Sequence, residues 1–279
     1  MNKHISRQPH YYIPAPSYWP IIGSFALLIT FAGFVLLLHQ AESGPYIMAA
    51  GILVLVYMLF GWFGTVIRES RQGLFNEQVD LSFRWGMCWF IFSEVMFFAA
   101  FFGALFYARF FAVPGLAETP MLWPGYSDTW PTAGPGLKDQ FTPMAAWGIP
   151  AVNTLILLSS GATVTWAHWG LKKNNRSQLN LGLLLTIVLG LVFLALQVYE
   201  YFIADFSLKT GIYGATFFML TGFHGAHVTL GAIMLSVILV RTLAGHFTPT
   251  SHFGFEAVTW YWHFVDVVWL ILFVFVYWL

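Results

Sequence analysis

Long runs of apolar residues, separated by short polar segments, fill most of this 279-residue chain. A transmembrane helix needs about 20 consecutive, mostly apolar residues. The pattern predicts an all-α integral membrane protein with seven such helices, of which the third, fourth and sixth are long enough to tilt or to project into water. The predicted spans are residues 18–38, 46–67, 83–111, 143–171, 179–204, 212–243 and 255–279.

The polar segments between the spans define the expected organisation of the chain. The first 17 residues are polar and proline-rich and lack the apolar core and cleavage site of a signal peptide, so we expect the first span to stay in the membrane. We expect four parts: a cytoplasmic segment 1–17, the first two helices in 18–67, an inner linker 68–82, and five helices in 83–279 with an outer loop at 112–142.

Lysine and arginine are distributed unevenly between the two sides of the predicted membrane. With the N-terminus in the cytoplasm, nine of the 12 basic residues lie on the inner side and three on the outer side. Cytoplasmic loops carry the excess of positive residues, so we expect the N-terminus inside and the C-terminus outside. The inner set is Lys3, Arg7, Arg68, Arg71, Arg84, Lys172, Lys173, Arg176 and Arg241, and the outer set is Arg109, Lys138 and Lys209.

Composition supports a membrane protein and excludes several other classes. Hydrophobic residues make up 58% of the chain and charged residues only 9%, against about 25% charged residues in soluble domains. A net charge of zero gives no sign of nucleic-acid binding. The single cysteine, Cys88, excludes an internal disulfide and a thiolate metal cluster.

Glu94 is a carboxylate inside the third span. It follows Arg84, at the inner start of this span, by ten residues, which places it about 15 Å deep at 1.5 Å per helical residue. An ionisable group at this depth is a functional-site candidate. The alternative is a protonated glutamic acid that is hydrogen-bonded to a neighbour, because burial favours the neutral form. We expect Glu94 to be neutral.

A second group of intramembrane polar residues comes from the last two spans. His263 and Asp266 lie one turn apart, and His224 and His227 lie on one face of the preceding span. Helical rise brings Asp266 and His227 to a similar depth. We expect a buried hydrogen-bonded cluster that ties the two helices together, with a metal or haem site and a proton relay as the alternatives. The glycine and alanine inside "HGAH" favour close helix packing.

Two other ionisable residues lie near the ends of predicted spans. Glu200, in "LQVYEYF", is near the outer end of the fifth span, where we expect it at the interface. His168 precedes Lys172 and Lys173 at the inner end of the fourth span, where cations suit a helix C-terminus and anionic lipids.

Several stretches resemble one known family over nearly the whole chain. They are "VIRES" (66–70), "RWGMCWFIFSEVMFF" (84–98), "WPTAG" (130–134), "NTLILLSSGATVTWAHWGL" (153–171), "LQVYEYF" (196–202), "YGATFFMLTGFHGAHVTLG" (213–231) and "HFGFEAVTWYWHFVDVVWL" (252–270). The family is subunit III of the haem–copper cytochrome c oxidases. The presence of the first two helices favours this branch over the quinol oxidases, whose third subunit usually lacks them.

The resemblance implies a non-catalytic subunit of a proton-pumping oxidase. Its fold would be two helices and five helices separated by a V-shaped cleft that is filled with phospholipids. Haem and copper would lie in partner subunits, and this chain would pack mainly on subunit I, with subunit II in the same complex. It would support proton uptake and stability in turnover and offer a route for oxygen.

The resemblance also assigns roles to individual residues. Glu94 matches the family's carbodiimide-reactive glutamate, which faces the lipid cleft. The family's lipid-binding positions correspond to Arg241, Arg84, Arg68, Glu69 and Trp62. The run "GWFGTV" and the linker "RQGLFNEQVDLSF" depart from the family pattern, the linker by lacking its histidines, so the contacts of the first two helices are less well defined.

Two other functions are compatible with the same residues. A stand-alone transporter would use Glu94 and Asp266, and a haem or metal enzyme would use His224, His227 and His263. An oxidase subunit purifies with haem-bearing partners, whereas a transporter stands alone and an enzyme holds its own metal. We expect a bacterial cytoplasmic membrane rather than a mitochondrial inner membrane.

Overall fold

The computed structural model describes residues 11–137 and 141–279, and within these two stretches the chain is all-helical and has no β-strand. Seven helices are long and apolar enough to cross a membrane, which confirms the predicted fold class. Lys3, Arg7 and Lys138, which entered the charge count, lie outside the described residues. The helices are α1 (Trp19–Leu38), α2 (Gly44–Arg71), α3 (Glu77–Tyr107), η1 (Ala108–Ala112), α4 (Val113–Ala117), α5 (Ile149–Lys172), α6 (Arg176–Ile203), α7 (Gly211–Leu243), α8 (Phe253–Leu272) and η2 (Phe273–Trp278).

The third and fourth spans depart most from their predicted boundaries. The third span is one continuous helical segment, Glu77–Ala117, and it starts early because the Asn76 side chain accepts a hydrogen bond from the Val79 amide at 2.9 Å. It therefore takes in part of the expected linker and the first residues of the expected outer loop. The fourth span begins at Ile149 rather than at 143. Pro150 then occupies the first turn, where a missing N–H costs nothing.

The chain forms two compact units, Met1–Phe83 and Arg84–Leu279. In the first unit, α1 and α2 form an antiparallel pair with very close backbone contact. Gly33 lies against the backbone of Met48, and Gly51 lies against Thr30, so that a side chain at either glycine would collide with the other helix. Small residues at a helix interface permit this approach inside a membrane. The V-shaped cleft between the two helix groups stays a prediction.

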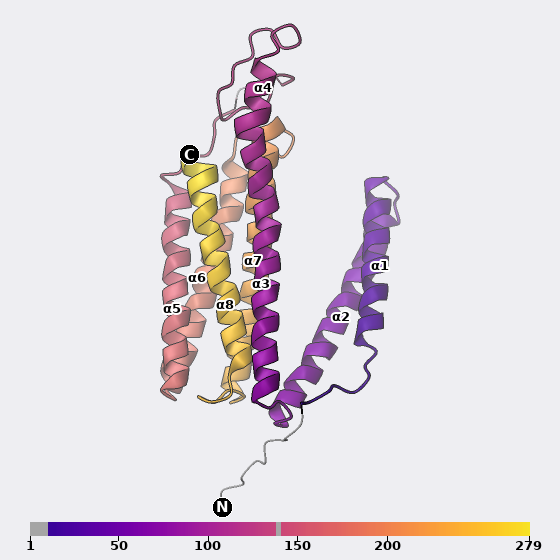
Figure 1. The fold of residues 1–279 in the computed structure, drawn as a ribbon, viewed down its shortest axis with the longest axis vertical. Helices are drawn as coiled ribbons and strands as arrows, with labels where there is room; N and C mark the ends of the chain where they lie inside the picture. Colours follow the sequence, from indigo (N-terminus) through magenta and orange to yellow (C-terminus); the bar gives the residue numbers. More distant parts are fainter. Residues whose placement is uncertain (1–10, 138–140) are drawn as a thin grey trace, which may run out of the picture. The chain divides into compact units, whose positions relative to one another are not determined.

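The second unit is built around Trp262 of α8, which is fully buried. Its indole packs between two glycines: a Cβ added at Gly190 of α6 would lie 2.6 Å from the ring, and one at Gly231 of α7 would lie 2.8 Å from it. Its Nε1 donates a hydrogen bond to the Ser160 hydroxyl of α5 at 2.9 Å. One side chain thus joins the four helices α5–α8, which run side by side in Figure 1.

Helix α3 packs on α7 and α8 through aromatic rings. Phe97 meets Phe223 of α7 with ring centroids 5.0 Å apart, and Phe98 meets Phe264 of α8 at 6.2 Å. The residues on the opposite face of α3, among them Trp89, are exposed and apolar. A surface of this kind suits contact with lipid or with another membrane subunit.

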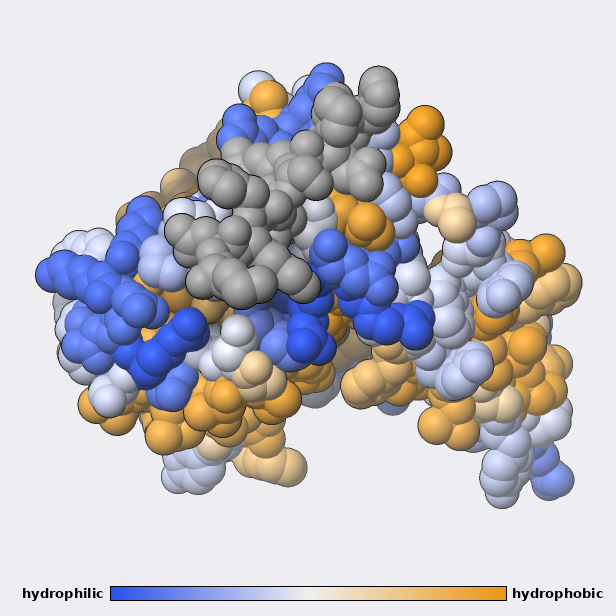
Figure 2. All heavy atoms as spheres, turned by 90° about the horizontal axis from the view of Figure 1, so that it is seen from below, coloured by the Kyte–Doolittle hydropathy of each residue, from blue (hydrophilic) through white to orange (hydrophobic). Residues whose placement is uncertain are grey.

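One end of this bundle gathers the polar helix termini. Here α5 and α7 end and α6 and α8 begin (Figure 1). Seen from this end, hydrophilic residues cover the tip and hydrophobic residues line its flanks (Figure 2). The basic residues at these helix ends are Arg84, Lys172, Lys173, Arg176 and Arg241. Their common position agrees with the predicted sidedness, and the assignment of this end to the cytoplasm stays a prediction.

Candidate functional site: the Glu94–His227 pair

Glu94 of α3 is hydrogen-bonded to His227 of α7. The Glu94 Oε2 atom lies 2.8 Å from His227 Nε2. The other ring nitrogen of His227, Nδ1, lies 2.7 Å from the carbonyl oxygen of Phe223, one turn back on the same helix. The side chains are largely shielded, with 22% of Glu94 and 12% of His227 exposed.

These two contacts fix the number of protons in the pair. A carbonyl oxygen only accepts, so His227 Nδ1 must carry a hydrogen and donate it to Phe223. The short contact to Glu94 then needs one further proton, either on the carboxyl group or on Nε2. In the first state both side chains are neutral, and in the second they form an ion pair. Both states have zero net charge, which lowers the cost of burying the pair in a membrane.

Aromatic rings surround the pair on the bundle side. The imidazole of His227 lies 4.9 Å from the Phe98 ring and 5.8 Å from the Phe97 ring, and it stacks on Tyr261 at 6.4 Å. These contacts leave little polar surface near the shared proton. The arrangement can hold and orient a proton between the two side chains.

The predicted cluster of Asp266 with the histidines of α7 and α8 divides into separate contacts. His227 is bonded to Glu94 rather than to Asp266. Asp266 lies 3.5 Å from His263 Nδ1, and His263 Nε2 lies 3.2 Å from the Thr165 hydroxyl of α5. Helical rise alone could not show whether His227 meets Glu94 or Asp266, because the two carboxyl groups are at similar depths. The rotation of each helix about its axis decides which carboxyl faces His227.

His224 and His227 do not share a partner, although they are one turn apart. His224 is fully buried, and its Nε2 lies 3.2 Å from the Val265 carbonyl of α8. This contact satisfies one ring nitrogen with backbone, so these two histidines do not converge on one point as metal ligands would. Within "HGAH", a Cβ at Gly225 would meet nothing within 4 Å in this chain. Close packing on α7 occurs at Gly231 instead.

Asp266 approaches α5 at a glycine. A Cβ at Gly161 would collide with the Asp266 carboxyl group in its present position, so the glycine allows this close approach. Asp266, His263 and Thr165 border a surface groove of about 520 Å³ between α5 and α8. His263 keeps 42% of its side chain exposed there.

The two arginines of the second unit that the resemblance assigned to lipid have different surroundings. Arg84 forms an ion pair with Glu256, with Nη1 and Oε2 2.6 Å apart. The Arg241 guanidinium lies 4.4 Å above the Phe247 ring and forms no ion pair with another described residue. Of these two arginines, therefore, only Arg241 has a guanidinium whose charge is not already matched by a carboxylate of the described chain.

The three lipid candidates of the first unit lie along the last part of α2. Trp62 is 47% exposed and stacks on Phe63. Arg68 is exposed and donates to the Thr65 hydroxyl at 3.2 Å, and Glu69 is half-buried. The pattern of an exposed indole followed by an exposed arginine one or two turns later is typical of the membrane interface.

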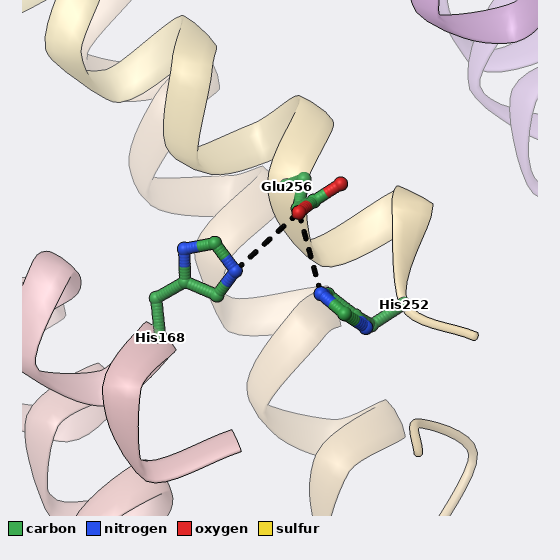
Figure 3. Close-up of side chains that lie close together, drawn as sticks. All are labelled: His168, His252 and Glu256. Carbon is green, nitrogen blue, oxygen red and sulfur yellow. Dashed lines mark ion pairs between the residues drawn. The ribbon is translucent and has the colours of Figure 1, made fainter. Parts of the chain in front are cut away.

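The structure brings together a further group that the sequence reasoning missed. His168, His252 and Glu256 converge at the polar end of α5 and α8 (Figure 3). The spacing of His252 and Glu256, four residues apart in "HFGFE", was the signal in the sequence that could have indicated this group.

The predicted position of Glu200 at the interface is wrong, because the structure buries this residue fully. It continues the buried face of α6 seven residues after Phe193, so it turns into the core.

Comparison with known proteins agrees with the resemblance. The family described as "Cytochrome c oxidase subunit III" matches residues 9–279. The chain is 44% identical over 275 residues to cytochrome c oxidase subunit 3 of Marchantia polymorpha, covering 98% of each chain. It is 43% identical over 269 residues to that of Papio hamadryas, covering 96% of each, and 44% identical over 279 residues to that of Chondrus crispus, covering 100% of this chain and 96% of the relative. A seven-span helical chain with these matches belongs to the cytochrome c oxidase subunit III family and is a subunit of the oxidase complex.

Proposed function

We propose that this chain is a non-catalytic core subunit of a proton-pumping cytochrome c oxidase and that the Glu94–His227 pair organises its membrane-embedded surface. The observation that carries the proposal is the hydrogen bond between the two side chains, at 2.8 Å, with aromatic rings against the imidazole. The two side chains share one proton, between Glu94 Oε2 and His227 Nε2, in a largely apolar setting. It supports proton uptake and turnover in the partner subunit by keeping α3 in register with α7, not by carrying protons itself.

Packing on subunit I is the second part of the proposal. The groove between α5 and α8 exposes His263 beside Asp266. Asp266 is ten residues, or about 15 Å, beyond Glu256 at the start of α8. Polar groups at this depth are costly against lipid and face protein instead. We infer that subunit I covers this groove, and that haem and copper reside in partner subunits, with subunit II in the same complex.

Phospholipid binding is the third part of the proposal. An arginine fork grips phosphate with two hydrogen bonds, and Arg241 has no carboxylate partner among the described residues. It is therefore the preferred head-group ligand. Arg84 is a weaker candidate because Glu256 already pairs with it. Arg68, Glu69 and Trp62 are proposed as contacts of the first unit. An oxygen route beside the bound lipid and a bacterial cytoplasmic membrane remain part of the proposal.

Oxygen consumption and proton pumping of the purified, reconstituted complex test the role of Glu94. Glu94→Gln keeps the shape and supplies an N–H to His227 Nε2, so both activities should stay close to those of the unchanged complex. Glu94→Ala leaves the ring nitrogen without a donor, which costs about 1–3 kcal/mol, and should loosen retention of this chain. Ser93→Ala, at the exposed neighbouring position, is the matched control.

The outcome of Glu94→Gln distinguishes a structural role of Glu94 from a role as a proton carrier. Loss of pumping with normal oxygen consumption and normal subunit retention would make Glu94 a proton carrier and refute the proposed role. A chain that purifies without haem-bearing partners and moves a solute would favour the transporter instead.

A further inference from the structure

Four polar side chains are buried near the end of the second unit that carries the C-terminus. Asn153 and Glu200 are fully buried, and Gln197 and Tyr277 are 3% and 7% exposed. They come from the beginning of α5, the last two turns of α6 and the final residues of η2, at the end of the bundle marked C in Figure 1. The proposed function uses none of these four residues.

Three of the four side chains lie close together. Gln197 and Glu200 are three residues apart, so they share the buried face of α6. The Tyr277 hydroxyl is near both of them. The Tyr277 ring packs on Trp269, with ring centroids 5.8 Å apart, and on Phe217 at 5.3 Å. These ring contacts hold the hydroxyl inside the bundle, facing the two side chains of α6.

The register of α5 and α6 brings the fourth side chain, Asn153, beside Gln197. The two helices are antiparallel, and Thr163 Oγ1 of α5 lies 2.8 Å from Thr186 Oγ1 of α6. The glycine contacts nearer the polar end of the same two helices keep this register. Because both helices rise equally per residue, Asn153 lies opposite Leu196, ten residues farther along each helix, and therefore next to Gln197.

The polar atoms of these four side chains have no hydrogen-bond partner among the described residues. Seven atoms are shielded from solvent in this way: both oxygens of Glu200, the oxygen and nitrogen of the Asn153 and Gln197 amides, and the oxygen of Tyr277. Buried polar side chains are normally hydrogen-bonded, since a buried group without a partner loses its hydration for no return. Seven such atoms in one region point to a ligand that lies between them.

The chemistry of the seven atoms favours water over an ion. A cation would contact only the oxygens and would leave the two amide nitrogens, which are donors, without acceptors. An anion would face the carboxyl group of Glu200, and no described lysine or arginine is paired with this group to balance a further negative charge. Water both donates and accepts, so it can serve the amides, the hydroxyl and the carboxyl group at once.

We propose that Asn153, Gln197, Glu200 and Tyr277 bind a cluster of internal water molecules. A buried water makes about three hydrogen bonds, so seven atoms require about two or three waters. Glu200 takes part as the neutral acid, because an ionised carboxylate without a cation is costly at this position in a membrane. The bridging hydrogen bonds join α5, α6 and the C-terminal segment η2, and they satisfy polar groups that no direct contact in the chain satisfies.

An experimental map of the intact, purified oxidase complex, at a resolution that shows ordered water, tests the proposal. We expect about two or three peaks between the four side chains, each within hydrogen-bond distance of at least two of them. A map without these peaks would overturn the proposal, and so would side chains that are bonded directly to one another. Rubidium ions are added in a second experiment. An anomalous peak at the same position would also overturn the proposal, because it would identify a cation site.

Variants of Glu200 give a second measurement in the same complex. Glu200→Gln still donates and accepts, so all peaks should remain. Glu200→Leu does neither, so the peak beside it should disappear. Tyr199→Phe removes an exposed hydroxyl from the preceding position of α6 and should leave every peak in place. A peak that persists beside leucine would refute the role of Glu200. If Glu200→Leu loses this subunit, Tyr277→Phe, which keeps the ring packing, should lose the peak beside the missing hydroxyl, and the map of the unchanged complex still decides.

Discussion

Replacement of Gly231 by alanine should destabilise the bundle at its tightly packed contact with Trp262. The added methyl would lie 2.8 Å from Cε3 and 2.9 Å from Cζ3 of Trp262, whereas carbon atoms in contact prefer about 3.5–4.0 Å. The indole has no space to withdraw. Gly190 contacts its opposite edge, and Ser160 accepts a hydrogen bond from its Nε1 at 2.9 Å.

The size of the effect follows from two opposing contributions. Overpacking of a well-packed core costs about 1–3 kcal/mol. Alanine favours a helix over glycine by about 0.8–1.0 kcal/mol on scales measured in water. Gly222 and Gly225 lie on the same helix, and a Cβ at either meets nothing within 4 Å. Their alanine variants therefore carry the propensity gain without the clash, and the difference from Gly231→Ala isolates the packing cost.

The assay is the temperature at which half of this chain is lost from the purified complex. At about 2–4 °C per kcal/mol for domains of comparable size, Gly231→Ala should lose the chain about 2–12 °C below the Gly222→Ala and Gly225→Ala controls. Equal temperatures for all three variants would refute the assignment of Trp262 as the point that joins the four helices. A drop confined to a control would instead identify its glycine as a contact with a partner subunit.

Two further changes test other parts of the structure. Arg241→Gln should lower the phospholipid retained by the purified complex, measured by mass spectrometry, because each basic residue near an anionic surface contributes about 1 kcal/mol; lipid content equal to that of the unchanged complex would contradict the head-group assignment. Gly161→Ala should displace Asp266 from α5 and lower retention of this chain under detergent challenge, whereas unchanged retention would show that the groove contributes nothing to assembly.

The number and type of spans could be predicted from the sequence because their cause is local. A run of about 20 apolar residues meets the length of a bilayer whatever its neighbours are, and each predicted span corresponds to a long helix. Helix ends were less predictable. The start of α3 depended on the Asn76 cap and the start of α5 on proline at its first turn, both of which are short-range features that hydropathy does not register.

The sequence motifs were also sufficient to indicate the family. Stretches such as "TGFHGAHVTLG" and "FEAVTWYWHFVDVVWL" contain the residues that meet at the centre of the bundle. Glycine in the first motif and tryptophan in the second belong to the same contact, between Gly231 and Trp262. The contact joins the two motifs across the α7–α8 interface.

Only the tertiary structure decided which polar side chains meet. A helix rises 1.5 Å per residue, so depth could be read from the sequence, and Glu94 and Asp266 were both suitable partners for His227. Rotation about the helix axis could not be read, because a span that is apolar on every side carries no amphipathic stripe to orient it. Packing of the Phe97 and Phe98 rings against α7 and α8 sets that rotation for α3 and turns Glu94 toward His227.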